Sequence, residues 1–396
     1  MAADRKNSFL LVLSKILTPF LSILLLFCLI EGAFILAKYE PLKLFQVAAR
    51  TGKHYLEKSS NKYVRYELSP NYQGNINGVK IRINSHGFRG REYEVDKKNH
   101  FRIILLGDSI TFGRTIPEKD TFAAKLEKSL KKVKPKTEVL NMGVDGYDTL
   151  QEVLQFKKNG LKFSPDLVLV CYCLNDIGVT PLDFGFMDMY LNPKRSFMYH
   201  FRVWRWINAK FRKISLMNRL KRELLAVGGF GAYYSELFPP VEKDKFLEDQ
   251  ITAIQQIQRK FQKSAPDSKQ AVIDKPRHLW LNQYTSLKNI GKIRYAFEQL
   301  KEMSDSYRFQ VMVVIVPFLY KIKGSYLDAP AHAIIQNEAH RAGFKVIDLY
   351  EKLNSFGFEK ISLDGVHLNA LGHQLLADVL FQELHQSKEM RHLISK

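Results

Sequence analysis

The sequence predicts an α/β fold of the flavodoxin-like type, with three layers (α/β/α) around a five-stranded parallel sheet. Two observations predict it. Five apolar segments of strand length lack polar–apolar alternation, which is typical of parallel strands covered on both faces. Helical patterns separate these segments, and such β–α alternation favours a doubly wound sheet. An N-terminal transmembrane helix and a mostly helical insertion are expected in addition.

The membrane anchor is predicted at residues 16–37, which carry one charge, Glu31. As a helix this stretch is about 33 Å long, enough to cross a hydrocarbon core of roughly 30 Å. A cleaved signal peptide is one alternative, but Ile35 and Ala37 match a small-x-small cleavage site poorly. A buried core helix is another, and all-round apolarity argues against it. Positive charges on both sides cancel the positive-inside bias.

The remaining domain boundaries follow from composition. Residues 1–15 form a cytoplasmic N-terminus, and residues 38–99 form a spacer rich in Tyr, Asn, Gly and Lys. Within the spacer, residues 79–84 alternate like a short half-buried strand, so we expect a small β element that packs on the next domain. The α/β domain occupies residues 100–386, and a tail, 387–396, ends the chain.

Strands and helices are expected to alternate along the α/β domain. The strands lie at 101–106, 137–143, 166–174, 309–317 and 344–349, and the helices near 121–132, 149–158, 290–307, 329–342 and 370–386. The alternation is interrupted at about 181–289, too long for a simple loop. Active sites of such sheets gather beyond the carboxyl ends of the strands, so functional residues are expected directly after them.

Ser109 follows the first strand in LLGDSITFG, at a turn from strand to helix. A serine there acts as a nucleophile if a base reaches it, and its N–H at a helix start can donate to a developing oxyanion. A helix cap or a phosphate-binding turn is the alternative. Asp108 is expected to brace this turn by hydrogen bonds.

Asp364 and His367 form the second candidate element. Their spacing places carboxylate and imidazole on one turn, so that Asp364 can orient one ring nitrogen while the other takes the serine proton. A capping aspartate beside an unrelated surface histidine is the simpler alternative for this pair alone. His373 is also considered as a base, but at the start of the last helix it is expected to pack or cap.

Two further residues follow strands. Asn175, after the third strand, can offer a side-chain N–H to an oxyanion. Gly146, after the second, has a bare backbone N–H that can approach a substrate oxygen closely, although turn glycines are common. With the serine and the Asp–His pair, these residues lie at the strand ends where such a sheet forms its site.

Four blocks in this order resemble the GDSL (SGNH) hydrolase family. They are GDSITFG (107–113), NMGVDGYDT (141–149), CLND (173–176) and DGVH (364–367). The resemblance implies that Ser109 is the nucleophile and that His367 is the general base, oriented by Asp364. It implies further that Ser109 N–H, Gly146 and Asn175 form the oxyanion hole, and that no cofactor or metal is needed.

The N-terminal span, the stretch INSHGFRGREYE (83–94) and the GDS strand together resemble membrane-anchored bacterial members of the family. In those proteins the hydrolase domain lies outside the cytoplasmic membrane, which implies the same single-pass arrangement here. Leu174 departs from the glycine that the third block more often has, which narrows the site without touching a catalytic atom.

The expected function is therefore hydrolysis of a small acyl ester, with an O-acetyl group on a carbohydrate or envelope polymer as the favoured substrate. Transfer of the acyl group to a sugar hydroxyl through the same acyl-enzyme is one alternative. A tethered, non-catalytic binding protein that has kept the fold is another, and the complete residue set speaks against it. The sequence does not predict the oligomeric state.

The net charge of +20 favours anionic surroundings. Ten of the basic residues lie in 192–223, with apolar residues near helical spacing. These apolar residues are Phe197, Phe201, Trp204, Phe211, Ile214 and Leu220. A basic amphipathic helix facing an anionic membrane surface is favoured. A solvated helix packed on the insertion is the alternative, and nucleic acid is the least favoured partner.

Overall fold

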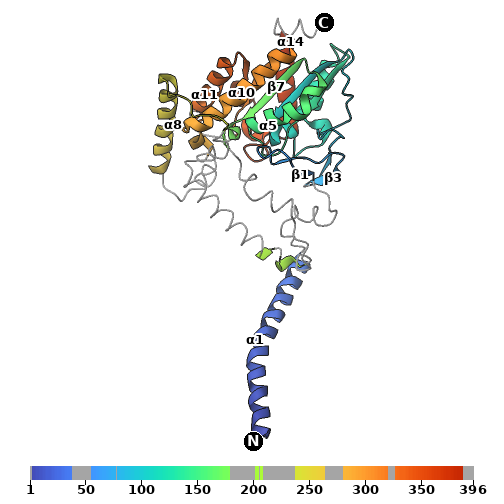
Figure 1. Cartoon of the computed structure of the whole chain (residues 1–396), viewed down its shortest axis with the longest axis vertical. Coiled ribbons are helices and arrows are strands. Elements are labelled where there is room, and N and C mark those ends of the chain that lie inside the picture. Colours follow the sequence, from blue (N-terminus) through green and yellow to red (C-terminus); the bar gives the residue numbers. More distant parts are fainter. Residues whose placement is uncertain are drawn as a thin grey trace. The chain divides into compact units, whose positions relative to one another are not determined.

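The computed structural model describes residues 2–37, 55–76, 78–178, 201–204, 206–207, 237–263, 280–319 and 326–386. The chain divides into two compact units, which are described separately (Figure 1). One unit comprises residues 1–52 and 192–219, and the other comprises residues 53–191 and 220–396.

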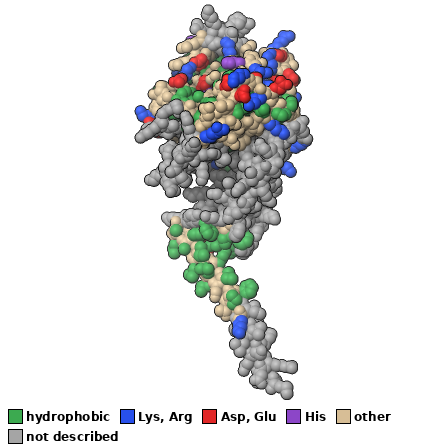
Figure 2. Space-filling model, turned by 90° about the vertical axis from the view of Figure 1, so that its left-hand side faces the viewer, with side chains coloured by type: hydrophobic (Ala, Val, Ile, Leu, Met, Phe, Trp, Pro, Cys, Tyr) green, Lys and Arg blue, Asp and Glu red, His purple; other side chains and the backbone are tan. Residues whose placement is uncertain are grey.

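The first unit contains helix α1 (Ala2–Leu36). Its segment Leu17–Leu36 has a mean hydropathy of 2.4 and is not buried, and Figure 2 shows hydrophobic side chains along this part of the helix. By length and composition the segment can cross a membrane, and a signal sequence would pass the same test. It coincides with the predicted anchor at 16–37.

Glu31, the charged residue of this apolar segment, is hydrogen bonded within the unit. Its carboxylate accepts the backbone N–H groups of Arg202 at 2.9 Å and Val203 at 2.8 Å. The Arg202 guanidinium donates in turn to the carbonyl of Phe34 at 2.8 Å. A carboxylate that binds the first N–H groups of a helical turn satisfies donors that the turn itself leaves unpaired. The chain therefore provides this charge with its own partners.

The second unit is built on a five-stranded parallel sheet of order β6-β5-β7-β8-β9. Its strands are β5 (Phe101–Gly107), β6 (Thr137–Asn141), β7 (Leu167–Cys173), β8 (Gln310–Val316) and β9 (Lys345–Asp348). Numbered along the chain this is the order 2-1-3-4-5, which confirms the predicted flavodoxin-like fold. Strands β5 and β7 are buried at every residue, as a sheet covered on both faces requires.

Helices connect the strands and pack in two groups. The main ones are α3 (Ser109–Phe112), α4 (Phe122–Leu130), α5 (Thr149–Gln155), α10 (Leu287–Tyr307), α11 (Ala329–Arg341) and α14 (Ala370–Gln386). Helix α4 packs against α14, whereas α10 packs against both α5 and α11. The short helices α12 (Tyr350–Asn354) and α13 (Phe358–Ile361) lead to the last loop. The five expected helices are thus present, and α3 is an addition at the turn that carries Ser109.

Two antiparallel hairpin-like sheets precede the main sheet. Strand β1 (Leu56–Lys58) pairs with β2 (Tyr66–Leu68), and β3 (Gln73–Ile76) pairs with β4 (Val79–Arg82). The predicted strand at 79–84 corresponds to β4. Apolar side chains of these strands form a second core, which also includes residues that follow β5 and β6, namely Phe112, Val144 and Tyr147. From residue 55 onward the predicted spacer is therefore packed on the loops that carry the candidate site.

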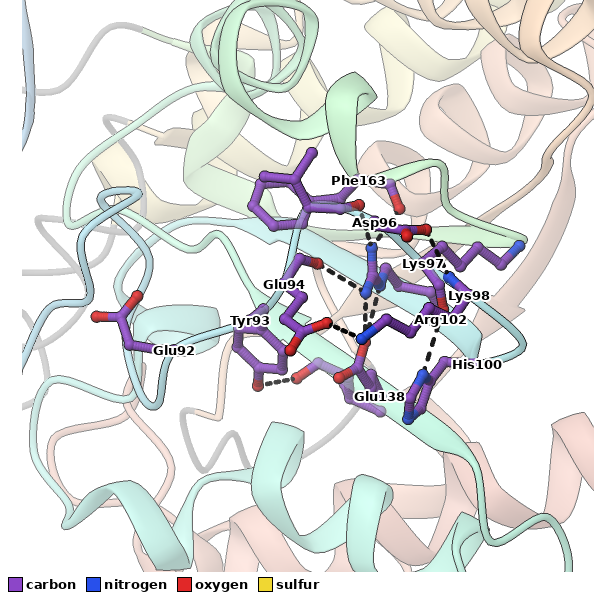
Figure 3. A network of polar contacts seen from close by, with 12 residues as sticks. Glu92, Tyr93, Glu94, Asp96, Lys97, Lys98, His100, Arg102, Glu138 and Phe163 are labelled. Carbon is purple, nitrogen blue, oxygen red and sulfur yellow. Dashed lines mark hydrogen bonds and ion pairs between the residues drawn. The ribbon is translucent and has the colours of Figure 1, made fainter.

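A buried arginine fastens the chain before β5 to the amino-terminal edge of the sheet (Figure 3). Arg102 is 1% exposed, and its Nε and Nη2 donate to Glu138 Oε2 at 2.9 and 2.6 Å. The same guanidinium donates to the carbonyls of Phe163 at 2.7 Å, Glu94 at 3.0 Å and Val95 at 3.2 Å. Every charged atom has a partner, so removing either member of this pair would cost about 3–5 kcal/mol.

The predicted insertion at 181–289 lies partly outside the described residues, and so does most of the basic segment 192–223. Of its six apolar residues, only Phe201 and Trp204 are described. The described part of the insertion includes helix α8 (Lys245–Lys263), which packs against α11.

The two ends of the insertion meet beside the short helix η4 (Leu174–Ile177). Tyr284 OH donates to the carbonyl of Leu174 at 2.9 Å and lies 2.8 Å from Tyr172 OH. On α10, Lys292 Nζ donates to Asp148 Oδ2 at 2.9 Å and to the carbonyl of Asp176 at 3.2 Å. The chain leaves the described part of the sheet after Gly178 and returns next to the same helix, η4.

Candidate active site

Ser109 is the first residue of α3, directly beyond the carboxyl end of β5. Asp108 caps this helix, because its Oδ1 accepts the N–H of Ile110 at 2.9 Å. Gly113 ends the helix at a φ of 70°, a left-handed conformation that favours glycine. The turn is therefore closed at both ends, and the half-buried Ser109 hydroxyl is presented at the carboxyl edge of the sheet.

The structure brings Ser109 together with the Asp–His pair, across 258 positions of sequence. Ser109 Oγ lies 3.0 Å from His367 Nε2, and His367 Nδ1 lies 2.7 Å from Asp364 Oδ2. The other carboxylate oxygen of Asp364 accepts the N–H groups of Val366 at 3.0 Å and His367 at 2.8 Å. One carboxylate thus holds both the imidazole ring and the backbone of its turn. The arrangement is that of a nucleophile, a base and an orienting acid.

The loop that carries Asp364 and His367 is attached to the end of β8. The N–H of Leu319 donates to the carbonyl of Gly365 at 2.7 Å, and the N–H of Leu363 donates to the carbonyl of His367 at 2.9 Å. Gly365 has a φ of 85°, which a residue with a Cβ adopts at a cost. The histidine is therefore positioned by backbone contacts as well as by the acid.

The electrostatics of the pair favour an ionised acid and a basic histidine. Partial burial alone would raise the pKa of Asp364, but hydrogen bonds from the His367 ring and backbone outweigh it and hold this pKa well below its ordinary value. For His367, burial alone would lower the pKa, but the hydrogen bond and charge of Asp364 raise it above its ordinary value. Asp108 and Asp145 act in the same direction on His367.

Asn175 is held next to Ser109 by Asp108. Asn175 Nδ2 donates to Asp108 Oδ2 at 3.1 Å, and Ser109 Oγ lies 3.3 Å from the same oxygen. Burial raises the pKa of Asp108, against the hydrogen bonds from Ile110 and Asn175. Because one N–H of the amide is fixed on the acid, the orientation of the second N–H on the same nitrogen is fixed as well. The predicted bracing role of Asp108 agrees with these contacts.

Gly146 lies in the loop after β6, beside the end of β5. The N–H of Val144 donates to the carbonyl of Gly107 at 3.0 Å, which joins the two strand ends. Gly146 has a φ of 76°, so the loop takes a left-handed turn there that favours glycine. Tyr66 OH donates to the carbonyl of Asp145 at 2.7 Å and steadies the residue before it. All five predicted site residues therefore lie on neighbouring loops of one sheet edge.

Sequence reasoning missed one of the buried acids behind the site, Glu152. Glu152 is 1% exposed, and no partner is described for either carboxylate oxygen. Burial, with the neighbouring carboxylates Asp108 and Asp148, raises the pKa of Glu152 well above its ordinary value. Burial raises the pKa of Asp176 in the same way, and Lys292 contacts both Asp148 and the carbonyl of Asp176. A charged residue at a core position of α5 is the signal that marks this cluster in the sequence.

His373 packs and caps, as expected, and is separate from the candidate triad. Its Nδ1 accepts the N–H of Phe122, at the start of α4, at 3.2 Å, and the two rings stack at 14°. Burial, with the positive charges of Arg89 and Lys125, lowers the pKa of His373 to about 3. Within the described residues, no three His, Cys, Asp or Glu side chains are grouped to hold a metal ion.

The α/β sheet thus brings Ser109, His367 and Asp364 into contact at its carboxyl edge. The family model described as GDSL-like lipase/acylhydrolase matches residues 105–375, from the nucleophile strand to the last helix. The chain therefore belongs to the GDSL-like lipase/acylhydrolase family. None of the curated proteins matches it significantly.

Several solved structures are similar over most of their length. An acetylxylan esterase from Geobacillus stearothermophilus has 12% identity and a TM-score of 0.37, over 72% of this chain and 93% of that chain. A lipase/acylhydrolase from Enterococcus faecalis has 14% identity and a TM-score of 0.37, over 72% of this chain and 96% of that chain. Because both TM-scores are low, the family assignment rests on the sequence match.

Proposed function

We propose that this protein is a membrane-anchored serine esterase in which Ser109, His367 and Asp364 form the catalytic triad. The observation that carries the proposal is the continuous contact from Ser109 Oγ to His367 Nε2 at 3.0 Å and from His367 Nδ1 to Asp364 Oδ2 at 2.7 Å. Nucleophile and base lie within hydrogen-bond reach, and a third group orients the base. Membership of an ester-hydrolysing family agrees with this chemistry.

In the proposed reaction, Ser109 Oγ attacks the ester carbonyl carbon while His367 Nε2 takes its proton. The oxyanion that develops is stabilised by the N–H groups of Ser109 and Gly146 and by the Asn175 side chain. His367 then gives its proton to the leaving alkoxide as the C–O bond breaks. Water then attacks the acyl-enzyme with His367 again as the base. The bond between Ser109 Oγ and the acyl carbon breaks, His367 returns the proton to Ser109, and the carboxylic acid leaves. Asp364 stabilises the imidazolium in both steps.

Turnover of p-nitrophenyl acetate by the full chain in detergent tests this assignment. Ser109→Ala is expected to lower kcat by at least about 10⁴-fold, because the covalent route is lost. Ser355→Ala is the matched control, since the Ser355 hydroxyl donates to the carbonyl of Lys352 on an exposed turn. Equal rates for the wild type and Ser109→Ala would refute the triad.

The proposed substrate is an O-acetyl or similarly small acyl ester on a carbohydrate or envelope polymer. Support comes from the esterase family and from the tether, which would hold the enzyme beside envelope material. The net charge of +20 suits an anionic polymer or surface. Acetate released from an O-acetylated glycan, compared with acyl transfer to added free sugar, separates hydrolysis from the transferase alternative.

We further propose that α1 is an uncleaved anchor and that the catalytic unit lies on the extracytoplasmic side. An apolar segment of 20 residues supports the anchor, and the family resemblance supports the side. The basic segment 192–223 would then contact anionic lipid near the anchor. In a bacterial host, alkaline phosphatase fused after residue 396 is expected to be active and to stay with the membrane. An active β-galactosidase fusion at the same position would show instead that the catalytic unit lies in the cytoplasm.

A further inference from the structure

The stretch Asn84–Gly90 (NSHGFRG) precedes strand β5 and forms a loop that is held by hydrogen bonds of the Asn84 side chain. Asn84 Oδ1 accepts the N–H groups of His86 at 3.0 Å and Phe88 at 2.9 Å, and its Nδ2 donates to the carbonyl of Arg91 at 2.9 Å. Phe88 is fully buried in the main core. A loop fixed in this way on both sides of its turn presents the next side chain, Arg89, in one direction.

The backbone of Arg89 is held between two strands. It forms bridges to Ile83, just after β4, and to Asn141, at the end of β6. Its N–H donates to the carbonyl of Asn141 at 3.2 Å, and the next N–H, of Gly90, donates to the carbonyl of Arg82 at 3.0 Å. Arg89 is 2% exposed, so its side chain points into the protein from a fixed base.

The Arg89 guanidinium binds the end of the nucleophile helix. It donates to the carbonyls of Phe112 and Gly113, and to the carbonyl of Ile116 at 2.6 Å. Asn141 Nδ2 covers a fourth carbonyl, that of Thr111, at 2.6 Å. The carbonyls at the end of a helix lack intrahelical donors and carry partial negative charge, so a buried cation with a fork of donors satisfies them together.

Helix α3 is only four residues long, from Ser109 to Phe112. A single turn fixes many backbone angles for few hydrogen bonds, so it needs support from outside. Asp108 binds the N–H of Ile110 at the start of this turn, and Arg89 binds the carbonyl of Gly113 at its end. Burial lowers the pKa of Arg89 to about 10, against the charges of Asp145 and Glu118, so the guanidinium stays protonated at neutral pH.

We propose that Arg89 is a positioning residue for the nucleophile, fixing the Ser109 turn through the carbonyls of Phe112, Gly113 and Ile116. The proposal rests on the proposed function for its catalytic consequence. Arg89 contacts neither the hydroxyl nor the histidine in the described structure, so it acts through the turn. A lysine there keeps the charge but offers one compact ammonium, which cannot reproduce the planar fork.

The test compares Arg89→Lys with Arg82→Lys in the full chain in detergent. Arg82 is the matched control, because its exposed side chain pairs with Glu118 at 2.9 Å. For Arg89→Lys, kcat with p-nitrophenyl acetate is expected to fall about 100-fold with little change in KM, since misplacing the nucleophile acts on the reacting step. Arg82→Lys is expected to keep both constants. Wild-type kcat in Arg89→Lys would overturn the proposal.

A second measurement is independent of catalysis. Hydrogen exchange at the amides of residues 110–116 is expected to accelerate at least about tenfold in Arg89→Lys, while residues 287–307 of α10 keep their protection. Unchanged exchange at 110–116 overturns the positioning role even if activity falls. The two proposals can fail separately. If exchange at 110–116 is faster in Arg89→Lys but wild type and Ser109→Ala have equal activity, the positioning role stands and the esterase assignment is rejected.

Arg89→Lys could also unfold the whole unit, which loss of protection in α10 would reveal. In that case Asn141→Ala carries the test, because it removes the neighbouring contact to the carbonyl of Thr111 and leaves the guanidinium in place. It also removes the contact of Asn141 Oδ1 with the N–H of Gly143, so exchange over residues 110–116 is the deciding measurement. Its kcat is expected to fall about tenfold with faster exchange over residues 110–116. Wild-type exchange there in Asn141→Ala would contradict the dependence of the nucleophile on these carbonyl contacts.

Discussion

Asp364 contacts both the ring of His367 and the backbone N–H of the same residue. Its side chain is 54% exposed, yet the hydrogen bonds hold its pKa well below the ordinary value. The carboxylate therefore stays ionised through the pH range in which the histidine titrates. That combination fixes the tautomer of the base and raises its pKa.

Asp364→Asn is expected to change both the rate and the pH profile. His367 accepts a proton only when neutral, so kcat/KM rises with pH through its free-enzyme pKa, which Asp364 raises. Removing the charge lets this pKa fall, so the acid limb shifts to lower pH while kcat drops on the order of 10⁴-fold. Steady-state rates from pH 5 to 9 measure both effects. Asp378→Asn on α14 is the control, and an unmoved acid limb would contradict the pairing.

Single residues also show where sequence reasoning stopped. The proposed site residues Ser109, Asp364 and His367 could be singled out because the short blocks that contain them occur in the order typical of a known family. The roles of Arg89 and Arg102 were not predictable, because an arginine is expected at the surface unless its buried partners are known. Those partners are backbone carbonyls and one acid from distant segments, and a carbonyl leaves no mark in the amino-acid sequence.

At the scale of elements, His373 joins two helices that pack on one another. Located in the first turn of α14, it accepts the N–H of Phe122, the first residue of α4. Because its pKa is lowered to about 3, the unfolded chain binds a proton at pH values where the folded chain does not. Its contribution to stability is therefore complete above about pH 6.5 and is lost as the pH falls toward 3.

His373→Asn is expected to reduce this dependence on pH. Asparagine keeps an acceptor near the position of Nδ1 but does not titrate, so the variant should be less stable at pH 7 and lose less stability between pH 7 and pH 5. Urea unfolding at both values measures the difference, with the slope reporting about one proton. His385→Asn, in the last turn of α14, is the control. Parallel losses in wild type and His373→Asn would show that folding leaves the pKa of His373 unchanged.

The elements themselves were predicted unevenly. Long apolar strands such as β7 were found because both faces are buried, which leaves a continuous run of Leu, Val and Cys. Strands β1, β2 and β3 were missed, since β1 and β2 have three residues each, too few to show an alternation, and Gly74 interrupts β3. Their pairing depends on a second core completed by loops of the main domain.

At the scale of the molecule, residues 55–92 belong to the same compact unit as the main sheet. Tyr147 OH donates to the carbonyl of Tyr66, and Gln151 Nε2 donates to that of Val64 at 3.2 Å. The compact unit accordingly begins at Lys53 rather than at the nucleophile strand. A chain that begins at residue 100 would expose the second core and lose Arg89.

Two truncated chains test this boundary. Residues 53–396 are expected to give a cooperative thermal transition and p-nitrophenyl acetate turnover, whereas residues 100–396 are expected to aggregate, because apolar loop surface is left uncovered. Size-exclusion chromatography and near-ultraviolet circular dichroism compare the two. Equal folding of both chains would mean that strands β1 to β4 are not needed for the α/β domain to fold.

The long excursion between Gly178 and Trp280 leaves and rejoins the α/β unit at neighbouring points, where Tyr284 meets Leu174. An insertion whose two ends lie close together can lengthen at little entropic cost, since each doubling of its length costs only about 0.6 kcal/mol. The sequence and length of the insertion can therefore change without disturbing the sheet. The insertion begins three residues after Asn175, so a change in its length or sequence alters the chain next to the proposed site.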